Sequence, residues 1–359
     1  MKKVLIIIFI GIFLTLLLLF FRFPQKSSDV HVTQKNALTS KKENAVKAFP
    51  LDNPTSVKTE VAALRAAVAA RDREALDRAK ISLISFINAH PGLVDDYVAV
   101  LQSEQNEHVL RAFALALAET EVGLLANDKI ISAAIQLAKD SSFEQRQHIM
   151  LNLMAKFPEM RDNVFQTVLE LSQHDPNSQV KTSAVVVLAD WMERFPDKKE
   201  SLLEHVGQIF KTAADEDVRV FTYQILALHS EQLPRELQTA LVERLKTEPD
   251  SFNANLLATA LAAAPEDLRQ KALAHLQTDF EKETNLEKKR NQLAQIVCLA
   301  KKESGPLLEK ISAGDSLLAQ DARDYLALLS AGKIKPEALF QQKAIRDANR
   351  QAGSEPHRD

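Results

Sequence analysis

The sequence of 359 residues has little glycine and almost no cysteine. Its 8 glycines are all isolated, whereas loops that cradle phosphate groups need several glycines close together. The single cysteine, Cys298, lies in an apolar stretch and cannot form an intramolecular disulfide, so we interpret it as a buried core residue. His-Glu-x-x-His, Cys-x-x-Cys and Gly-x-Ser-x-Gly patterns are also missing. We therefore predict no catalytic residue, no metal ligand and no cofactor, and expect a protein that is not an enzyme.

A basic surface is missing as well. The chain has 45 lysines and arginines against 48 aspartates and glutamates, for a formal net charge of −3. Proteins that bind nucleic acid need lysine and arginine to neutralise phosphates, so we exclude nucleic acid as a partner. The abundant residues are Ala, Leu, Glu, Gln and Lys, which lose least on entering a helix. This composition predicts an all-α fold.

One long uncharged run stands near the N-terminus. Val4–Phe21 has no charged side chain, and as a helix it would span about 27 Å, enough to cross a bilayer core. No small-x-small site ends the run, which favours an uncleaved signal-anchor over a cleaved signal peptide, although the latter stays open. We predict a transmembrane helix in residues 1–23, with the N-terminus in the cytoplasm. The rest of the chain would then lie outside the cytoplasm, in the periplasm if the cell is Gram-negative.

Two stretches lack the helical pattern of the rest. Residues 24–54 are rich in Gln, Ser, Thr, Asn and Lys, and we interpret them as a flexible linker. Residues 332–359 are interpreted as a short helix followed by a disordered C-terminal tail. The remaining residues, 55–331, carry the repeats described next.

Polar residues recur ahead of helical patterns at intervals of roughly 30 to 40 residues. A stack of helical hairpins produces such a rhythm. After Asp175, for example, Val180, Ala184, Leu188 and Trp191 form one apolar stripe of an amphipathic helix. The recurring positions are Gln105, Asp140, Asp175, Asp215, Asp250, Asn285 and Asp315.

A turn aspartate followed by Val, a basic residue, and then Ala and Leu resembles the HEAT repeat. Asp175 with Lys181 and Asp215 with Arg219 are the closest matches. The resemblance implies an α-solenoid of about eight stacked antiparallel helix pairs, with the turn acids and basic residues forming a ladder along one edge. An armadillo-like or unclassified helical array stays open. The predicted ladder consists of Asp140, Asp175, Asp215, Asp250, Asn285, Asp315, Arg146, Lys181, Arg219 and Arg323.

Individual residues in the repeats receive structural interpretations. The turn acids are interpreted as helix caps, and Trp191 as a core residue. Three Glu-x-x-x-His pairs place a carboxylate and an imidazole one helical turn apart, a spacing that could serve a metal or a proton relay. Because a stacked array would not bring them to one point, we interpret them as surface pairs. They are Glu104 with His108, Glu144 with His148, and Glu170 with His174.

A solenoid offers an extended surface for binding another macromolecule. We therefore expect a membrane-tethered, non-enzymatic scaffold or adaptor that binds a protein partner. By resemblance to HEAT arrays, the second helix of each pair would form the concave docking face, whose contact residues the sequence does not identify. Two alternatives stay open: a structural spacer in an envelope assembly, and a HEAT-like enzyme of the lyase type.

Overall fold

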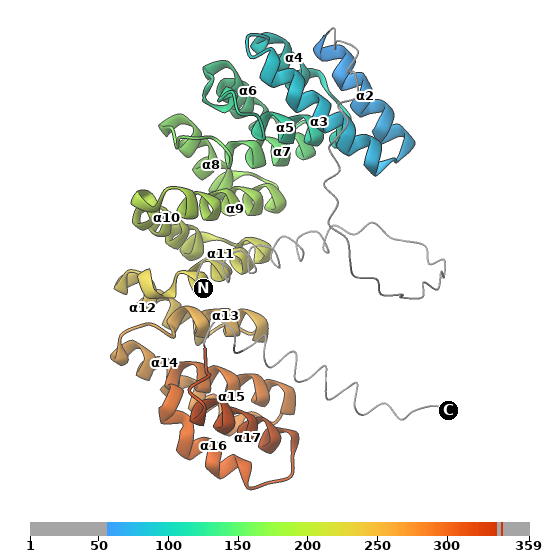
Figure 1. Cartoon of the computed structure of the whole chain (residues 1–359). Coiled ribbons are helices and arrows are strands. Elements are labelled where there is room, and N and C mark those ends of the chain that lie inside the picture. Colours follow the sequence, from blue (N-terminus) through green and yellow to red (C-terminus); the bar gives the residue numbers. More distant parts are fainter. Residues whose placement is uncertain (1–55, 336–338, 340–359) are drawn as a thin grey trace, which may run out of the picture. The chain divides into compact units, whose positions relative to one another are not determined.

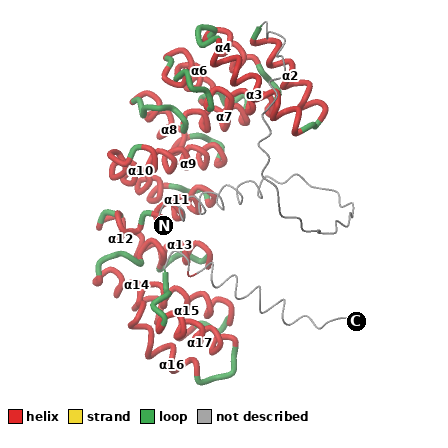
Figure 2. Tube along the Cα trace, viewed as in Figure 1, coloured by secondary structure: helices red, strands yellow, loops and turns green. Residues whose placement is uncertain are grey.

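The computed structural model describes residues 56–335 and residue 339. Every regular element in these residues is a helix, and they contain no strand (Figure 2). The predicted all-α fold is thus confirmed for this part of the chain. The predicted transmembrane segment, residues 1–23, and the linker, residues 24–54, lie outside the described residues. Among the helices that the structure describes, none is both long and apolar enough to cross a bilayer.

The α-helices of the described residues follow one another as eight pairs. Within a pair, a first helix and a second helix are joined by a short turn and pack side by side. The pairs are α2 (Val57–Ala70) with α3 (Arg73–Ala89), α4 (Val94–Ser103) with α5 (Glu107–Ala118), α6 (Asp128–Ala138) with α7 (Glu144–Met154), α8 (Asp162–His174) with α9 (Ser178–Arg194), α10 (Lys199–Thr212) with α11 (Glu216–Leu228), α12 (Arg235–Leu245) with α13 (Ser251–Leu261), α14 (Glu266–Lys282) with α15 (Leu286–Ala300), and α16 (Gly305–Ser312) with α17 (Leu317–Ser330).

The pairs stack in chain order. Each second helix contacts the second helix of the next pair, without interruption from α3 to α17. First helices also contact one another, for example α4 with α6 and α12 with α14. Figure 1 shows the pairs succeeding one another along the unit that begins at Asn53. Each pair therefore completes its core by packing against its neighbours.

Helix α9 illustrates how the sequence builds one element of the core. Asn177 caps its N-terminus by accepting a hydrogen bond from the backbone N–H of Gln179. The apolar stripe predicted for this helix is buried, and the Trp191 side chain within it has no exposed surface. The ring centroid of Trp191 lies 6.3 Å from that of Phe165 on α8. Trp191 is thus a core residue of this pair.

The last second helix, α17, ends in a turn at Gly332. Gly332 adopts a φ of +63°, which glycine tolerates best, and its N–H donates to the carbonyl of Leu329. The N–H of Lys333 donates to the carbonyl of Leu328 at 2.8 Å. Leu339, the next described residue after Lys335, is fully buried and belongs to the main hydrophobic core.

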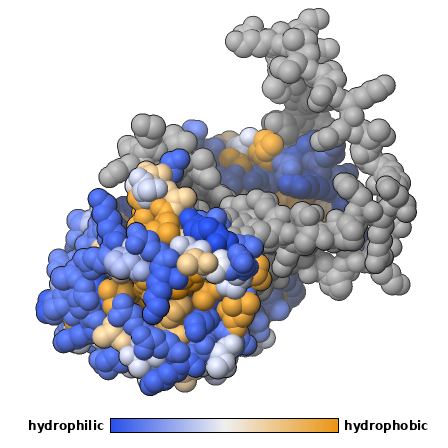
Figure 3. Space-filling model, turned by 90° about the horizontal axis from the view of Figure 1, so that it is seen from below, coloured by the Kyte–Doolittle hydropathy of each residue, from blue (hydrophilic) through white to orange (hydrophobic). Residues whose placement is uncertain are grey.

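The α16–α17 pair has apolar surface on the side that no further pair covers. In the view along this end, hydrophobic groups gather between hydrophilic ones (Figure 3). The pair contributes exposed Leu317 and the partly buried residues Leu307, Ile311, Leu318, Leu326, Leu328 and Leu329.

Candidate docking surface

The turns that begin the second helices hold capping side chains. At six of these turns the N-cap side chain accepts a hydrogen bond from a backbone N–H of the first helical turn, which satisfies groups that the helix leaves unpaired. Asp250 and Asn285 of the predicted ladder are such caps, accepting from Asn253 at 2.9 Å and Lys288 at 3.0 Å. The six caps are Asp72, Asn106, Asn177, Asp250, Asn285 and Ser316.

Other members of the predicted ladder lie ahead of the cap. Asp140 accepts from the backbone N–H of Ser142 at 3.0 Å, and Asp175 from that of Asn177 at 2.8 Å. These bonds fix the turn that precedes the helix. The side chain and backbone of Ser142 hold the pKa of the Asp140 carboxyl below its usual range. Asp315 is exposed and immediately precedes the cap of α17.

Two glutamates with buried side chains occupy the same position as Asp175, two residues before the cap. Glu104 accepts from the backbone N–H of Asn106 at 2.8 Å and from Arg65 Nε on α2 at 2.8 Å. Glu248 binds the Arg244 guanidinium at 3.0 Å. The prediction missed both glutamates. A search for an acid two residues ahead of Asn, Asp or Ser would have found them.

Of the four predicted ladder bases, Lys181 links consecutive pairs by an ion pair. Its Nζ lies 2.8 Å from Oδ2 of Asp215, the residue that begins the second helix of the next pair. Asp215 stands at the N-cap position of α11, but its side chain makes no capping bond. The hydrogen bond from Lys181 holds the pKa of the Asp215 carboxyl below its usual range.

The three arginines of the ladder bond mainly to backbone carbonyls. Arg146 is buried, donates to the carbonyl of Glu104 in the preceding pair at 3.1 Å, and lies 3.7 Å from Asp140. Arg219 donates to the carbonyl of Ala214, directly before its own helix. The remaining one, Arg323, donates to the carbonyls of Ser312 and Gly314 at 2.7 and 2.9 Å. The three arginines thus hold turns in place, each by its own set of bonds.

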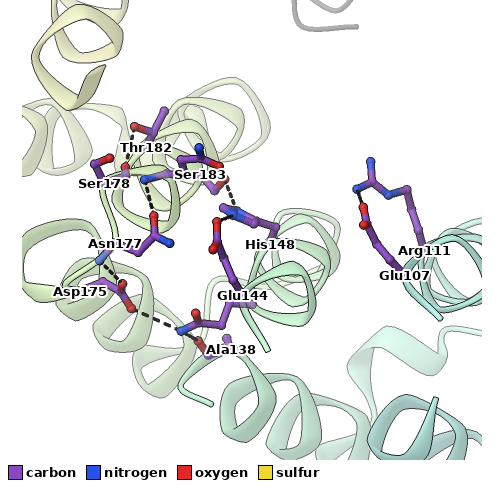
Figure 4. Close-up of polar contacts among 12 residues, drawn as sticks. Glu107, Arg111, Ala138, Glu144, His148, Asp175, Asn177, Ser178, Thr182 and Ser183 are labelled. Atoms are coloured by element: carbon purple, nitrogen blue, oxygen red, sulfur yellow. Dashed lines mark hydrogen bonds and ion pairs between the residues drawn. The ribbon is translucent and has the colours of Figure 1, made fainter. Parts of the chain in front are cut away.

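The three Glu-x-x-x-His pairs lie apart from one another. In the middle one, His148 Nε2 is 3.4 Å from Glu144 Oε1, and Nδ1 is 2.8 Å from Ser183 Oγ on α9 (Figure 4). In the other two, the glutamate bonds elsewhere: Glu104 to Arg65, and Glu170 to Lys139. Among the described residues, no group of three or more His, Cys, Asp or Glu side chains is placed to hold a metal ion.

Two shallow hollows lie along the edge formed by the turns. One, of about 180 Å³, lies between the turns that begin α13 and α15 and is lined in part by Glu248, Asp250 and His275. The other, of about 100 Å³, is lined in part by Lys181 and Asp215. Sites for small-molecule substrates are usually about 300 Å³ or more. Neither hollow therefore offers a site of substrate size.

The second helices present a stripe to solvent, formed by the residues five, nine and thirteen positions after each N-cap. Residues four apart lie on one side of a helix, so the three positions share a face. On α3 and α5 the stripe is open at all three positions. Its central residues there are apolar, with Ile81 61% and Leu115 45% exposed. The stripe consists of Asp77, Ile81 and Ser85 on α3, and of Arg111, Leu115 and Glu119 on α5.

At the other end of the stack, the residues at the same stripe positions are buried. On α15 its positions are Arg290, Ala294 and Cys298, of which Arg290 is 7% exposed and the other two not at all. On α17 the first two positions are Asp321 and Tyr325, and neither is exposed. The second-helix surface therefore changes from open at α3 and α5 to buried at α15 and α17.

Comparison with known proteins gives no relative: no model of a known protein family matches the chain, and no curated protein matches it. The resemblance to HEAT repeats therefore rests on the turn residues and stays a prediction.

Proposed function

We propose that the chain is a membrane-tethered, non-enzymatic scaffold with a HEAT-like arrangement of repeats, which binds a protein partner on the second-helix stripe of α3 and α5. The observation that supports this most directly is the open stripe, where Ile81 and Leu115 stand at equivalent positions of neighbouring helices. Large apolar side chains that recur on an exposed face are typical of docking surfaces.

The surroundings of the two apolar residues suit a protein partner. Asp77 and Ser85 flank Ile81 on α3, and Arg111 and Glu119 flank Leu115 on α5. Protein interfaces commonly combine an apolar centre with a polar rim, in which charges of both signs set the orientation of the partner. A rim of mixed sign is suited to a folded protein or a peptide rather than to a uniformly charged polymer.

The proposed tether comes from the sequence. Val4–Phe21 would cross the membrane, and residues 24–54, if flexible, would span roughly 30 Å between the membrane and the repeats. The stripe would then be held close to the membrane, on its periplasmic side in a Gram-negative cell. A partner in the same membrane or next to it would meet the stripe at a raised effective concentration.

Site-specific photo-crosslinking in cells tests the proposal. A photoreactive amino acid is placed at Leu115 on α5 or Asn152 on α7, both exposed on second helices. Matched controls carry it at Gln136 on α6 or Gln166 on α8, which are exposed on first helices. We expect the second-helix positions to capture one defined protein and the first-helix positions to capture none.

A charge substitution makes the test sharper. Leu115→Glu leaves the buried core untouched and should reduce capture at position 152 by about tenfold or more, because an apolar anchor at an interface commonly contributes over 1 kcal/mol. Capture of the same proteins from first and second helices, or of no protein at any position, would overturn the proposal. The second of these outcomes would favour the structural spacer.

A further inference from the structure

Exposed apolar residues recur where the last three second helices begin. Phe252 is the second residue of α13 and is 55% exposed. Leu286 and Leu317 are the first residues of α15 and α17, and each is 44% exposed. In the five earlier second helices, the first two residues are all polar. Single exposed apolar residues are common on protein surfaces, but their recurrence in three consecutive pairs is a pattern that core packing does not require.

The starts of these three helices lie next to one another. Helix α13 contacts α15, and α15 contacts α17. Arg290 and Asp321, each five positions after its N-cap, form an ion pair in which Nε lies 2.6 Å from Oδ2, so α15 and α17 begin near the same level. A hollow of about 180 Å³ is lined by residues of the turns that begin α13 and α15. Phe252, Leu286 and Leu317 therefore form one row, which we call the turn-edge strip.

The surroundings of the turn-edge strip are acidic. The three turns comprise residues 248–252, 283–288 and 314–318, and they contain more acids than bases. Acids at a helix start stabilise the helix, but they also attract a basic partner and repel an anionic membrane or a nucleic acid. The charged residues of the three turns are Glu248, Asp250, Glu283, Glu287 and Asp315 against Lys288.

The hollow between the first two turns offers acceptors to a basic side chain. The bonds that hold Asp250 and Glu283 in their turns use one oxygen of each carboxylate, Oδ1 and Oε1. The second oxygen of each can accept from a lysine or arginine of a partner. Of the two lysines in the lining, Lys246 pairs at 2.7 Å with Glu243, outside the lining. A water molecule occupies about 30 Å³, so the hollow has room for the end of one long side chain.

The spacing of the turn-edge strip matches the period of an α-helix. Packed helices lie about 8–10 Å apart, so the strip extends over about 20 Å. Residues seven apart lie on one side of an α-helix and are about 10.5 Å apart along its axis. A partner helix with an apolar residue at every seventh position, lying across the three turns, would therefore meet the three apolar residues in order. Its lysines and arginines would face the acids between them.

We propose that the turn-edge strip docks a basic amphipathic helix of a partner protein. This site shares no residue with the open stripe of α3 and α5, so it does not depend on the docking surface proposed above. With both sites, the stack binds two segments at once, one at each end of the array.

A synthetic peptide tests the proposal. The probe is a fluorescent peptide of about 18 residues, with leucine at every seventh position and lysine and alanine elsewhere. Its binding to the full-length protein in mild detergent is measured by fluorescence anisotropy. We expect Leu286→Ser and Leu317→Ser each to weaken binding about fivefold or more, because each removes an apolar anchor of the interface. Both residues are exposed, so a thermal melt should show the wild-type Tm.

Matched controls separate the turn-edge strip from other apolar surface. Leu228→Ser alters a leucine that is 60% exposed on α11 and should leave the affinity unchanged. A peptide with glutamate in place of lysine should not bind. In cells, a photoreactive amino acid at position 286 should form crosslinks to a basic, amphipathic segment of another protein.

Three results would overturn the proposal: equal weakening by Leu228→Ser, equal binding of the glutamate peptide, or crosslinks from position 286 only to this chain or a second copy of it. The last result would assign the strip to a contact within the chain or to self-association. Leu115→Glu should leave peptide binding unchanged, so failure at one surface is distinguishable from failure at the other.

Discussion

Arg290 on α15 and Asp321 on α17 form an ion pair with two contacts inside the protein. Arg290 Nε lies 2.6 Å from Oδ2, and Nη2 lies 3.3 Å from Oδ1 of the carboxylate. Asp321 has no exposed surface, and Arg290 is 7% exposed. Removing one partner of a buried pair leaves the other charge in a poor solvent, whereas replacing both removes that cost.

Asp321→Asn should therefore destabilise the protein by about 3 kcal/mol or more, measured by urea unfolding. The double variant Arg290→Met with Asp321→Leu should recover most of this loss. If the double variant is as unstable as the single one, the ion pair is not the source of the effect.

Glu104 gives a second prediction, because its carboxylate joins two elements of the stack. It accepts hydrogen bonds from Arg65 on α2 and from the backbone N–H of Asn106, and it is 4% exposed as a whole residue. Glu104→Gln removes the charge that both donors face and should cost about 1–3 kcal/mol of unfolding free energy. The control Glu107→Gln affects the ion pair between Glu107 and Arg111, which both lie on α5 and are more exposed than Glu104. This control should change stability by less than about 0.5 kcal/mol.

His229 predicts a pH dependence of stability. Burial, with a smaller contribution from Lys199, lowers the pKa of His229 from 6.5 to about 4. The Glu193 carboxylate, 3.9 Å away, would favour the charged ring, but Glu193 is about half exposed, so burial dominates. The unfolded chain thus takes up a proton at a higher pH than the folded one. The contribution of His229 is fully present above about pH 6.5 and is lost as the pH falls toward 4.

Between about pH 6.5 and pH 4, the contribution of His229 to the free energy of unfolding should fall by up to about 3 kcal/mol. His229→Gln should flatten the pH profile between pH 4 and 6.5, as measured by chemical unfolding at several pH values. His174→Gln, at an exposed position, should keep the wild-type profile. An unaltered slope in His229→Gln would show that other groups cause the pH dependence.

The backbone conformation of Lys301, directly after α15, leads us to expect that a substitution at this position stabilises the protein. Its backbone has φ 52° and ψ −121°, a combination that residues with a Cβ atom rarely adopt. Lys301→Gly should raise the unfolding free energy by about 1 kcal/mol, visible as a higher Tm. Lys301→Ala removes the same long side chain but keeps the Cβ atom, and it should give no such gain. Equal effects of the two variants would assign the change to the side chain.

Much of the architecture could be predicted from local sequence patterns. The apolar stripe from Val180 to Trp191 and the polar residues ahead of it depend on helical periodicity and on unpaired N–H groups, both of which act within a few residues. These signals were enough for the all-α fold and for the spacing of the turns. Capping positions such as Asp250 and Asn285 can be predicted from the same local signals.

The sequence could not reveal what depends on distant partners. Glu104 reads as a surface acid until Arg65, on another helix pair, is found beside it. Arg290 and Asp321 likewise occupy positions that are open to solvent on α3 and α5, and their burial depends on packing near the end of the chain. Side-chain type and periodicity do not encode such contacts, because the residues that make them are separated by many turns of helix.

The stacking of each pair mainly on its immediate neighbours has a mechanical consequence. When such a protein is pulled, load passes from pair to pair in series, and the weakest boundary yields first while distant pairs keep their structure. Extension would proceed in steps of about one pair each. A chain built in this way can act as an elastic connection that lengthens under tension and recovers its length when the tension is released.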